Sequence, residues 1–334
     1  MKRTILITGG AGYIGSHTAY YMAQQGYHVI ILDTLIHGQQ WPHQWATCLV
    51  NDFADTHILK KIFQEHTIEA VMHFAAYAQV GQSMKEPLAY YENNVGKVIT
   101  LIQMMLKYKI KKFIFSSSCA VYGIPHSIPI SEDHSCNPIN PYGATKYMVE
   151  RILADCNRSD NLQYISLRYF NAAGALPELG LGEYHVPETH LIPLLFHAAM
   201  HQKPFTVFGN DHETSDGTCV RDFLHVADIA QAHCLALQHL NRGLPSDIFN
   251  LGTGTGFSIK QVLATAEKLC NTRISIRYAA KREGDPAILI ADPSRARTIL
   301  GWSPKCSQLE FIVRSAYFPL SKTQDQPKAR LPRC

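Results

Sequence analysis

The chain has 334 residues, 46% hydrophobic and 17% charged, which is enough to bury the core of one large or two smaller globular domains. The net charge is only +4, long Lys/Arg blocks are missing and no apolar run approaches a membrane span, so neither nucleic acid nor membrane is expected as a partner. The nine cysteines contain no Cys-x-x-Cys pair, which predicts reduced thiols and a cytoplasmic location.

The N-terminal segment carries a glycine pattern between a predicted strand and a predicted helix. An apolar run at 4–8 is followed by Gly9, Gly12 and Gly15 and by an amphipathic stretch to Gln25. Glycines in this position allow a tight turn and let backbone N–H groups and the helix N-terminus approach a pyrophosphate. Glycine-rich turns also occur without a ligand, so the pattern alone is a weak signal.

A second strand, predicted at 27–32, ends at Asp33, which follows Gly15 by 18 residues. An acid at this distance binds the ribose hydroxyls of a dinucleotide and repels a 2′-phosphate. The segment thus has, in order, the strand, glycines, helix, second strand and acid of a dinucleotide-binding unit. The sequence therefore predicts NAD rather than NADP as the cofactor.

The next segments continue to alternate between strands and helices. Asn51, Asp52 and Phe53 follow the third strand, where they could hold the adenine edge, and Ala75-Ala76 follow the fourth. Small residues there suit either a cofactor backbone or plain helix–sheet packing. The alternation predicts an α/β fold, a doubly wound parallel Rossmann sheet. The predicted strands are 46–50, 69–74, 112–117 and 162–168, and the predicted helices are 87–108 and 142–157.

A candidate catalytic group lies at the end of the fifth strand and the start of the following helix. Tyr142 and Lys146 are four residues apart on one helical face, and Ser116 to Ser118 close the strand. An ammonium near a phenol favours phenolate, so the pair could act as a base, with Ser118 relaying the proton. The spacing alone also fits an ordinary surface pair; the dinucleotide pattern favours catalysis. The 17 histidines form no His-Glu-x-x-His motif, so no catalytic metal is expected.

The residue composition changes after Asn171. Residues 174–188 are rich in Gly, Pro and Glu and begin a smaller, less regular region, while 223–251 resemble a return to the first domain. We predict an NAD-binding domain at 1–172 with the return segment 219–253, a substrate domain at 173–218 and 254–320, and a frayed tail at 321–334. In the substrate domain, strands are predicted at 205–208 and 274–278 and helices at 191–201 and 259–269.

Glycines 252, 254 and 256 could form a second phosphate loop. We favour a flexible connection before a helix, because one dinucleotide needs only one fingerprint.

The motifs together resemble the extended short-chain dehydrogenase/reductase family, and within it the UDP-hexose 4-epimerases. The resemblance covers residues 4 to about 315. The matching motifs are Gly-Gly-Ala-Gly-Tyr-Ile-Gly-Ser-His-Thr at 9–18, Tyr-Glu-Asn-Asn-Val at 91–95, Ser-Ser-Ser at 116–118, Val-Tyr-Gly at 121–123, Pro-Tyr-Gly-Ala-Thr-Lys at 141–146, Arg-Tyr-Phe-Asn at 168–171, Asp-Gly-Thr-Cys-Val-Arg-Asp at 216–222 and Arg-Glu-Gly-Asp at 282–285.

This resemblance implies that the chain interconverts UDP-glucose and UDP-galactose with tightly held NAD. Tyr142, assisted by Ser118, would take the proton of the sugar C4 hydroxyl, and Lys146 would hold the nicotinamide ribose and depress the pKa of Tyr142. The 4-keto sugar would then rotate and regain hydride on its opposite face. The family also implies a homodimer through the helices at about 87–108 and 142–157.

The resemblance assigns binding residues as well. The implied NAD contacts are Gly9, Gly12, Tyr13, Ile14, Gly15, Asp33, Asp52, Phe53, Phe74, Ala75, Ala76, Asn93, Ser116, Tyr142, Lys146, Tyr169 and Phe170. The implied UDP-sugar contacts are Ser118, Tyr142, Asn171, His190, Leu191, Thr206, Val207, Phe208, Arg221, Arg282, Asp285 and Leu289.

The chain departs from the family pattern at several positions. Ala78 stands where a lysine is frequent, His190 where Asn is common and Phe223 where Tyr is common. Leu289 aligns with a gate position that is Tyr in enzymes confined to plain hexoses, which predicts activity on UDP-GlcNAc and UDP-GalNAc as well. Leu289 could also be a plain core residue.

Other functions stay open at this point. A 4,6-dehydratase is disfavoured, because Ser118-Cys119 replaces the Asp-Glu pair that drives water loss in such enzymes. A UDP-glucuronate epimerase or decarboxylase, or a UDP-xylose 4-epimerase, would keep the same oxidation step. A non-catalytic NAD-dependent sensor would tend to lack Tyr142 or Lys146, and both are present.

Overall fold

The computed structural model describes residues 3–36, 45–185, 187–282 and 285–321. The predicted tail beyond Ser321 and residues 283–284 of the Arg-Glu-Gly-Asp motif lie outside these ranges. In the described ranges, no helix combines the length and apolar character that a membrane span requires.

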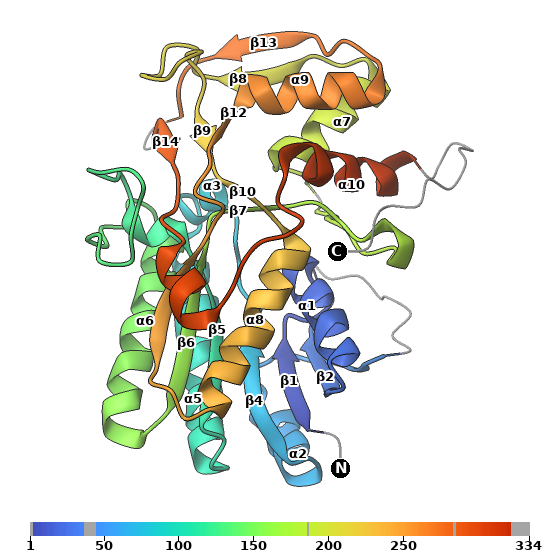
Figure 1. Cartoon of the computed structure of the whole chain (residues 1–334). Helices are drawn as coiled ribbons and strands as arrows, with labels where there is room; N and C mark the ends of the chain where they lie inside the picture. Colours follow the sequence, from blue (N-terminus) through green and yellow to red (C-terminus); the bar gives the residue numbers. More distant parts are fainter. Residues whose placement is uncertain (1–2, 37–44, 186, 283–284, 322–334) are drawn as a thin grey trace.

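A seven-stranded sheet organises the lower half of the molecule as drawn in Figure 1. Its strand order is β11-β6-β5-β4-β1-β2-β3, and each neighbouring pair is parallel. This confirms the predicted α/β doubly wound fold. The strands are β1 (Thr4–Thr8), β2 (His28–Asp33), β3 (Thr47–Val50), β4 (Ile68–His73), β5 (Lys112–Ser118), β6 (Gln163–Tyr169) and β11 (Asp247–Leu251).

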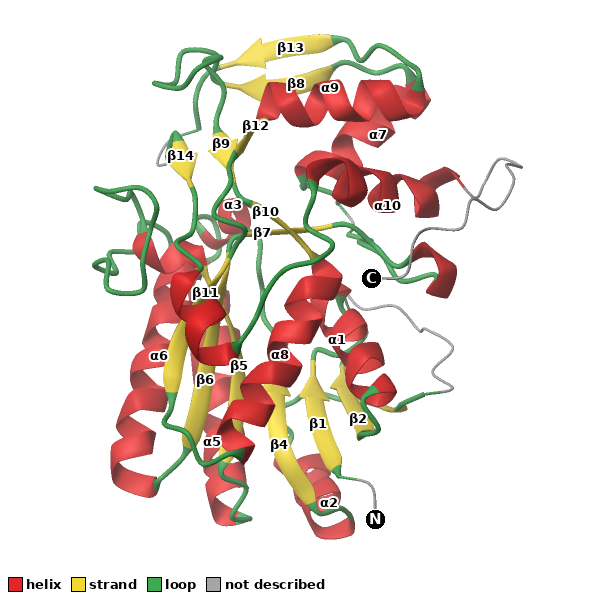
Figure 2. Cartoon of the chain, in the orientation of Figure 1, coloured by secondary structure: helices red, strands yellow, loops and turns green. Residues whose placement is uncertain are grey.

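Helices cover both faces of this sheet, as Figure 2 shows. Alternate residues of a strand point to opposite faces, so Ile5 and Ile7 of β1 join a cluster with α1 and α8, while Leu6 joins one with α2, α5 and α6. Both faces of the sheet are therefore shielded from water, which explains the continuous apolar runs of the strands. The helices are α1 (Tyr13–Gln24), α2 (Thr56–Glu65), α4 (Pro87–Tyr91), α5 (Lys97–Lys107), α6 (Pro141–Asp160) and α8 (Val226–Asn241).

The predicted helix at 87–108 is interrupted. A π-helical turn over Glu92–Gly96 separates α4 from α5, and it buries Asn93 and Asn94. Single π turns inside helices are frequent at functional sites. The interruption lies beside the pocket described below.

The upper part of Figure 1 has its own apolar cluster, which includes Ile192, Phe196, Val262, Leu263 and Ile312. Its two- and three-residue strands are too short to show a sequence period, so they were not predicted. The domain division at 172/173 stays a prediction. The remaining α-helices and β-strands are α3 (Val80–Ser83), β7 (Asn171–Ala173), α7 (Leu191–His201), β8 (Phe205–Phe208), β9 (Val220–Arg221), β10 (Phe223–His225), β12 (Phe257–Ser258), α9 (Ile259–Cys270), β13 (Ile276–Ala279), β14 (Ile288–Leu289) and α10 (Leu309–Ser321).

The segment after β11 has backbone amides engaged within the chain. Thr253 N and Gly254 N donate to the Asp222 carboxylate at 2.8 and 3.0 Å. This supports the connection rather than a second phosphate loop.

The cysteines meet the expectation of reduced thiols only in part. Cys306 is disulfide-bonded, contrary to that expectation. Free thiols are found at Cys48, Cys119, Cys136, Cys156, Cys219, Cys234 and Cys270.

Candidate active site

The turn between β1 and α1 has the geometry that the glycine pattern predicts. Gly9 has φ +73°, and a Cβ there would lie 2.4 Å from Ala75 N. A Cβ on Gly15 would lie 2.2 Å from Gly9 O. Any side chain at either position would push the turn away from the fourth strand or from the helix, so glycine is required by packing at both.

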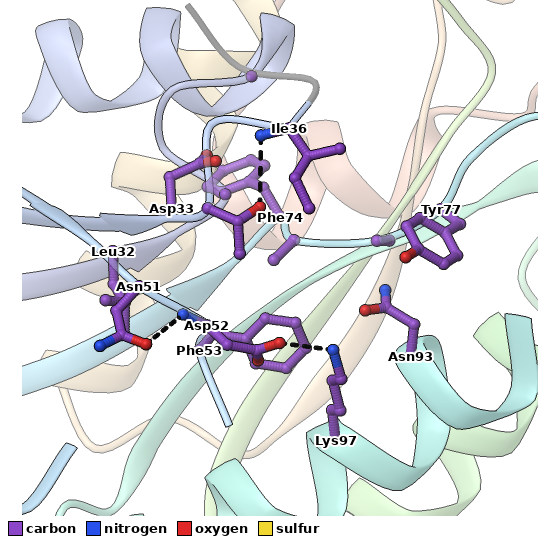
Figure 3. Close-up of a pocket in the computed structure, with 15 residues that line it drawn as sticks. Leu32, Asp33, Ile36, Asn51, Asp52, Phe53, Phe74, Tyr77, Asn93 and Lys97 are labelled. Carbon is purple, nitrogen blue, oxygen red and sulfur yellow. Dashed lines mark hydrogen bonds and ion pairs between the residues drawn. The ribbon is translucent and has the colours of Figure 1, made fainter. Parts of the chain in front are cut away.

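A pocket opens where β1, β2 and β4 end, at the carboxyl edge of the parallel sheet (Figure 3). Open α/β sheets bind dinucleotides at this edge. The predicted NAD contacts that line the pocket are Gly9, Gly12, Asp33, Asp52, Phe53, Phe74, Ala75, Ala76 and Asn93. Leu32, Thr34, Ile36, Asn51, Tyr77 and Lys97 line it as well.

The remaining predicted NAD contacts are not among the pocket's lining residues, and two of them have partners elsewhere. The Tyr13 hydroxyl donates to Gly174 O at 2.6 Å, and the Tyr169 hydroxyl hydrogen-bonds His233 Nε2 at 2.7 Å. The predicted contacts outside the pocket lining are Tyr13, Ile14, Gly15, Ser116, Tyr142, Lys146, Tyr169 and Phe170.

Asp33 connects the glycine turn to the end of β2. Its Oδ2 accepts from Ala11 N at 3.0 Å, and its Oδ1 accepts from Leu35 N at 2.9 Å. An ionised carboxylate has about four acceptor positions, so capacity remains for ribose hydroxyls. Asp33 and the tightly packed glycine turn together are consistent with NAD binding.

Asp33→Ala is expected to weaken NAD binding about 10- to 100-fold, because a hydrogen bond to a charged group contributes about 1.5–3 kcal/mol. It should also lessen discrimination against NADP, since the repulsive charge is removed. NAD and NADP affinities are measured by fluorescence titration of cofactor-stripped protein. Asp133→Ala, at a fully exposed carboxylate (93% exposed), is the control. Unchanged affinity and selectivity in Asp33→Ala would rule out the ribose contact.

Lys97 is a pocket residue that sequence reasoning missed. Its Nζ lies 2.5 Å from Asp52 Oδ2, and Figure 3 shows the two side chains directed toward each other. Asn93 and Lys97 are four residues apart, so a shared helical face was the available signal. The pair gives the pocket one cation next to one carboxylate.

The π turn joins the pocket to α6. Asn93 Nδ2 donates to Asn94 Oδ1 at 3.0 Å. Asn94 Nδ2 donates to Tyr77 O at 2.9 Å and to Thr145 Oγ1 at 3.2 Å. Because Thr145 precedes Lys146, these contacts fix the candidate catalytic helix relative to the pocket.

The candidate catalytic side chains meet where β5 ends and α6 begins. Asn140 Oδ1 caps α6 by accepting from Gly143 N at 2.8 Å. Lys146 Nζ donates to Ser116 O at 2.7 Å and lies 5.8 Å from the centre of the Tyr142 ring. Ser118 interacts with the Tyr142 phenol and acts to lower its pKa. Phenol, ammonium and hydroxyl are thus brought together.

The protonation of this group differs from the expectation. Burial raises the pKa of Tyr142 to about 12, with the Ser118 hydrogen bond acting in the opposite direction. Burial lowers the pKa of Lys146 to about 7, opposed by Glu150. In this structure burial therefore outweighs the expected depression of the Tyr142 pKa by Lys146.

Behind the catalytic group lies a buried ionic network. Glu150 follows Lys146 by one helical turn, and its Oε1 accepts from Ser117 Oγ at 2.6 Å and Arg168 Nε at 2.9 Å. Arg168 NH2 donates to Glu150 Oε2 at 2.6 Å, and the two side chains are only 4% and 2% exposed. Arg168 also donates to the Tyr122 hydroxyl at 2.9 Å. The network holds α6 against β5 and β6.

The predicted substrate contacts form two groups. In the first, Arg221 NH2 lies 2.5 Å from Asp285 Oδ1, and Arg221 pairs with Leu289 between β9 and β14. In the second, the Arg282 guanidinium lies 4.1 Å from the centre of the Phe208 ring, as in a cation–π contact. Thr206 and Val207 share β8 with Phe208, and Asn171 lies in β7.

His190, also a predicted substrate contact, has carboxylate partners instead. Its Nδ1 lies 2.8 Å from Glu183 Oε1 and 2.9 Å from Glu188 Oε1. Burial alone would lower the pKa of His190, but the hydrogen bonds to Glu183 and Glu188 raise it to about 10. Leu191 follows as the first residue of α7. These acidic partners carry no signal in the sequence beyond their proximity in the chain.

Comparison with known proteins gives consistent results. Residues 5–252 match the model of the NAD dependent epimerase/dehydratase family. The chain is 47% identical to the UDP-glucose 4-epimerase of Halalkalibacterium halodurans over 94% of each protein. It resembles the crystal structure of UDP-glucose 4-epimerase from Brucella ovis in complex with NAD (43% identity, TM-score 0.92, 95% and 98% of the chains covered). It also resembles the UDP-Glc/GlcNAc 4-epimerase of Campylobacter jejuni (38% identity, TM-score 0.84, 96% and 99% covered).

Proposed function

The chain belongs to the NAD-dependent epimerase/dehydratase family, and on this basis we propose that it interconverts UDP-glucose and UDP-galactose. The observation that carries the proposal is the meeting of Tyr142, Ser118 and Lys146 beside the Asp33 pocket. The similarity to the UDP-glucose 4-epimerases named above extends over nearly the whole length of those proteins.

NAD, when bound, supplies the hydride acceptor and donor at the sugar C4. Tyr142 takes the C4 hydroxyl proton, directly or through Ser118, while C4 becomes a ketone; the same proton returns when C4 is reduced on its other face. Lys146 is positioned by Ser116 O to hold the nicotinamide ribose. Gly9, Gly12 and Asp33 would hold the pyrophosphate and adenosine ribose.

The UDP part of the substrate is proposed to bind the upper part of the molecule. Arg221 and Arg282 offer guanidinium groups suited to a diphosphate, and Phe208 offers an aromatic face. Holding the substrate by UDP leaves the sugar free to turn, as return of hydride to the opposite face requires.

The direct test supplies UDP-galactose and measures UDP-glucose in a coupled assay, alongside the absorbance of NADH formed on the protein. Interconversion with transient NADH is the expected result. A UDP-glucuronate or UDP-xylose epimerase would act only on its own sugar, and a non-catalytic sensor would form no NADH. Either outcome would contradict the proposal.

Leu289→Tyr is expected to reduce turnover of UDP-GlcNAc at least tenfold and to leave UDP-galactose turnover within about twofold. Leu289 follows the predicted gate alignment and lies half-buried in β14, paired with Arg221. A larger aromatic side chain would fill the space for a 2-acetamido group. Initial rates on both sugars check this, with Ile290→Tyr as the neighbouring control. Absent UDP-GlcNAc turnover in the parent would show that Leu289 is not the gate.

We also propose a homodimer through α4–α6. Large apolar side chains are exposed there, including Leu88 (80%), Ile99 (39%) and Met148 (43%). Leu88→Lys should shift the chain from dimer to monomer in sedimentation velocity, whereas Leu244→Lys, at an exposed site after α8, should not. A monomeric parent would contradict this. The cytoplasmic location stays a prediction.

A further inference from the structure

The loop between β7 and α7 gathers four side chains that the proposed reaction does not use as a group. Glu183, His185, Glu188 and His190 each present one ligand atom, and these atoms all lie within 4.8 Å of one another. Their spacing is Glu-x-His-x-x-Glu-x-His. A short loop that turns both imidazoles and both carboxylates inward has the donor set of a metal site.

Contacts within the cluster centre on Glu183 Oε1. This oxygen lies 2.8 Å from His190 Nδ1 and 3.3 Å from His185 Nδ1, and the Glu183 side chain is only 9% exposed. Ligand atoms of a tetrahedral zinc ion lie roughly 3.4 Å apart, given metal–ligand distances of about 2.0–2.2 Å. Three of the distances within the cluster, 2.8, 2.9 and 3.3 Å, are close to that spacing.

One imidazole nitrogen in the cluster is incompletely satisfied. Within the described residues, His185 Nδ1 is shielded from solvent and lies 3.3 Å from Glu183 Oε1, but the pair does not have hydrogen-bond geometry. A buried polar atom without a partner is costly. A bound cation at the centre of the cluster would use its lone pair.

We propose that Glu183, His185, Glu188 and His190 form a site for a divalent transition metal of the zinc type, which fixes the loop before α7. Two imidazoles and two carboxylates suit Zn²⁺, whereas Mg²⁺ and Ca²⁺ prefer oxygen ligands alone. The metal would have a structural role, and its test by metal binding does not depend on the proposed reaction.

A second pair of histidines sets the design of the test. His197 and His201 form an exposed His-x-x-x-His pair on α7, with ring centres 4.4 Å apart, and such a pair can bind metal by itself. The experiment therefore uses the untagged full chain carrying His197→Ala and His201→Ala, stripped with EDTA. Zn²⁺ is then added in a titration against a chromogenic chelator.

One Zn²⁺ per chain is expected to bind this parent. Glu183→Gln and His185→Asn should each weaken binding more than about 100-fold, since loss of an outer-shell partner already costs 10–100-fold. Zn²⁺ should raise the melting temperature of the parent but not of these variants. Co²⁺ should give the intense visible bands of tetrahedral coordination.

His126→Asn, at an exposed histidine elsewhere, is the matched control and should change nothing. Two variants are used so that misfolding of one, detected by circular dichroism, leaves the other to decide. The proposal is overturned if the parent, which lacks His197 and His201, takes up no zinc. It is also overturned if both variants bind zinc as tightly as the parent.

Discussion

Tyr142→Phe is expected to lower kcat for UDP-galactose about 10²- to 10⁴-fold while NAD stays bound, the range typical of losing a general base. The phenol oxygen is the group placed to take the C4 proton, with Ser118 as its neighbour. The change removes only this oxygen and keeps the ring. Retained NAD is measured after gel filtration, and kcat is measured in the coupled assay.

Tyr147→Phe serves as the control, because Tyr147 lies on the same helix and packs in a neighbouring apolar cluster. Its kcat should stay within about twofold of the parent. If Tyr142→Phe turns over at a near-normal rate, another group takes the proton and the proposed mechanism fails.

Glu150→Gln is expected to lower the free energy of unfolding by about 3–5 kcal/mol. The change leaves the Arg168 guanidinium, only 4% exposed, without its opposite charge, and an uncompensated buried charge costs about this much. Ser117 and Tyr122, which complete the network, cannot replace a carboxylate. Urea unfolding followed by circular dichroism measures the loss.

The control is Glu310→Gln, which breaks the Arg314–Glu310 pair, half exposed on both sides. Exposed pairs contribute about 0.2–1 kcal/mol, so little change is expected. Replacing Glu150 and Arg168 together by Leu and Met should cost less than Glu150→Gln alone, because both charges are then gone. Equal losses from the buried and exposed variants would contradict this account of the network.

The sheet could be predicted from sequence because its strands are buried on both faces. Residues such as Ile5, Leu6 and Ile7 alternate between two apolar clusters, which produces uninterrupted apolar runs. The glycine turn could be predicted for a steric reason, since Gly9 and Gly15 admit no side chain. Both signals are local, and local signals survive in a single sequence.

Features that depend on contacts between distant parts of the chain could not be predicted from local sequence signals. The contact of Lys97 with Asp52 joins α5 to the loop after β3. The state of the Tyr142 group follows from its degree of burial, which desolvates Lys146 as well as the phenol. The histidine and glutamate loop has a spacing outside the familiar metal motifs. Short strands such as β9 and β14 form only by pairing with each other or with another strand, so they have no local signal.

The position of β11 at the edge of the sheet has a consequence for biosynthesis. β11 pairs with β6 from Asp247–Ile165 to Leu251–Tyr169, although α7, β8 and α8 are made between them. On the ribosome, the nascent sheet therefore presents β6, with its fully buried Ile165 and Leu167, as an open edge until Leu251 has emerged. Open apolar edges recruit other chains. A polypeptide released before Asp247 would thus be a substrate for chaperones and aggregation rather than a smaller working domain.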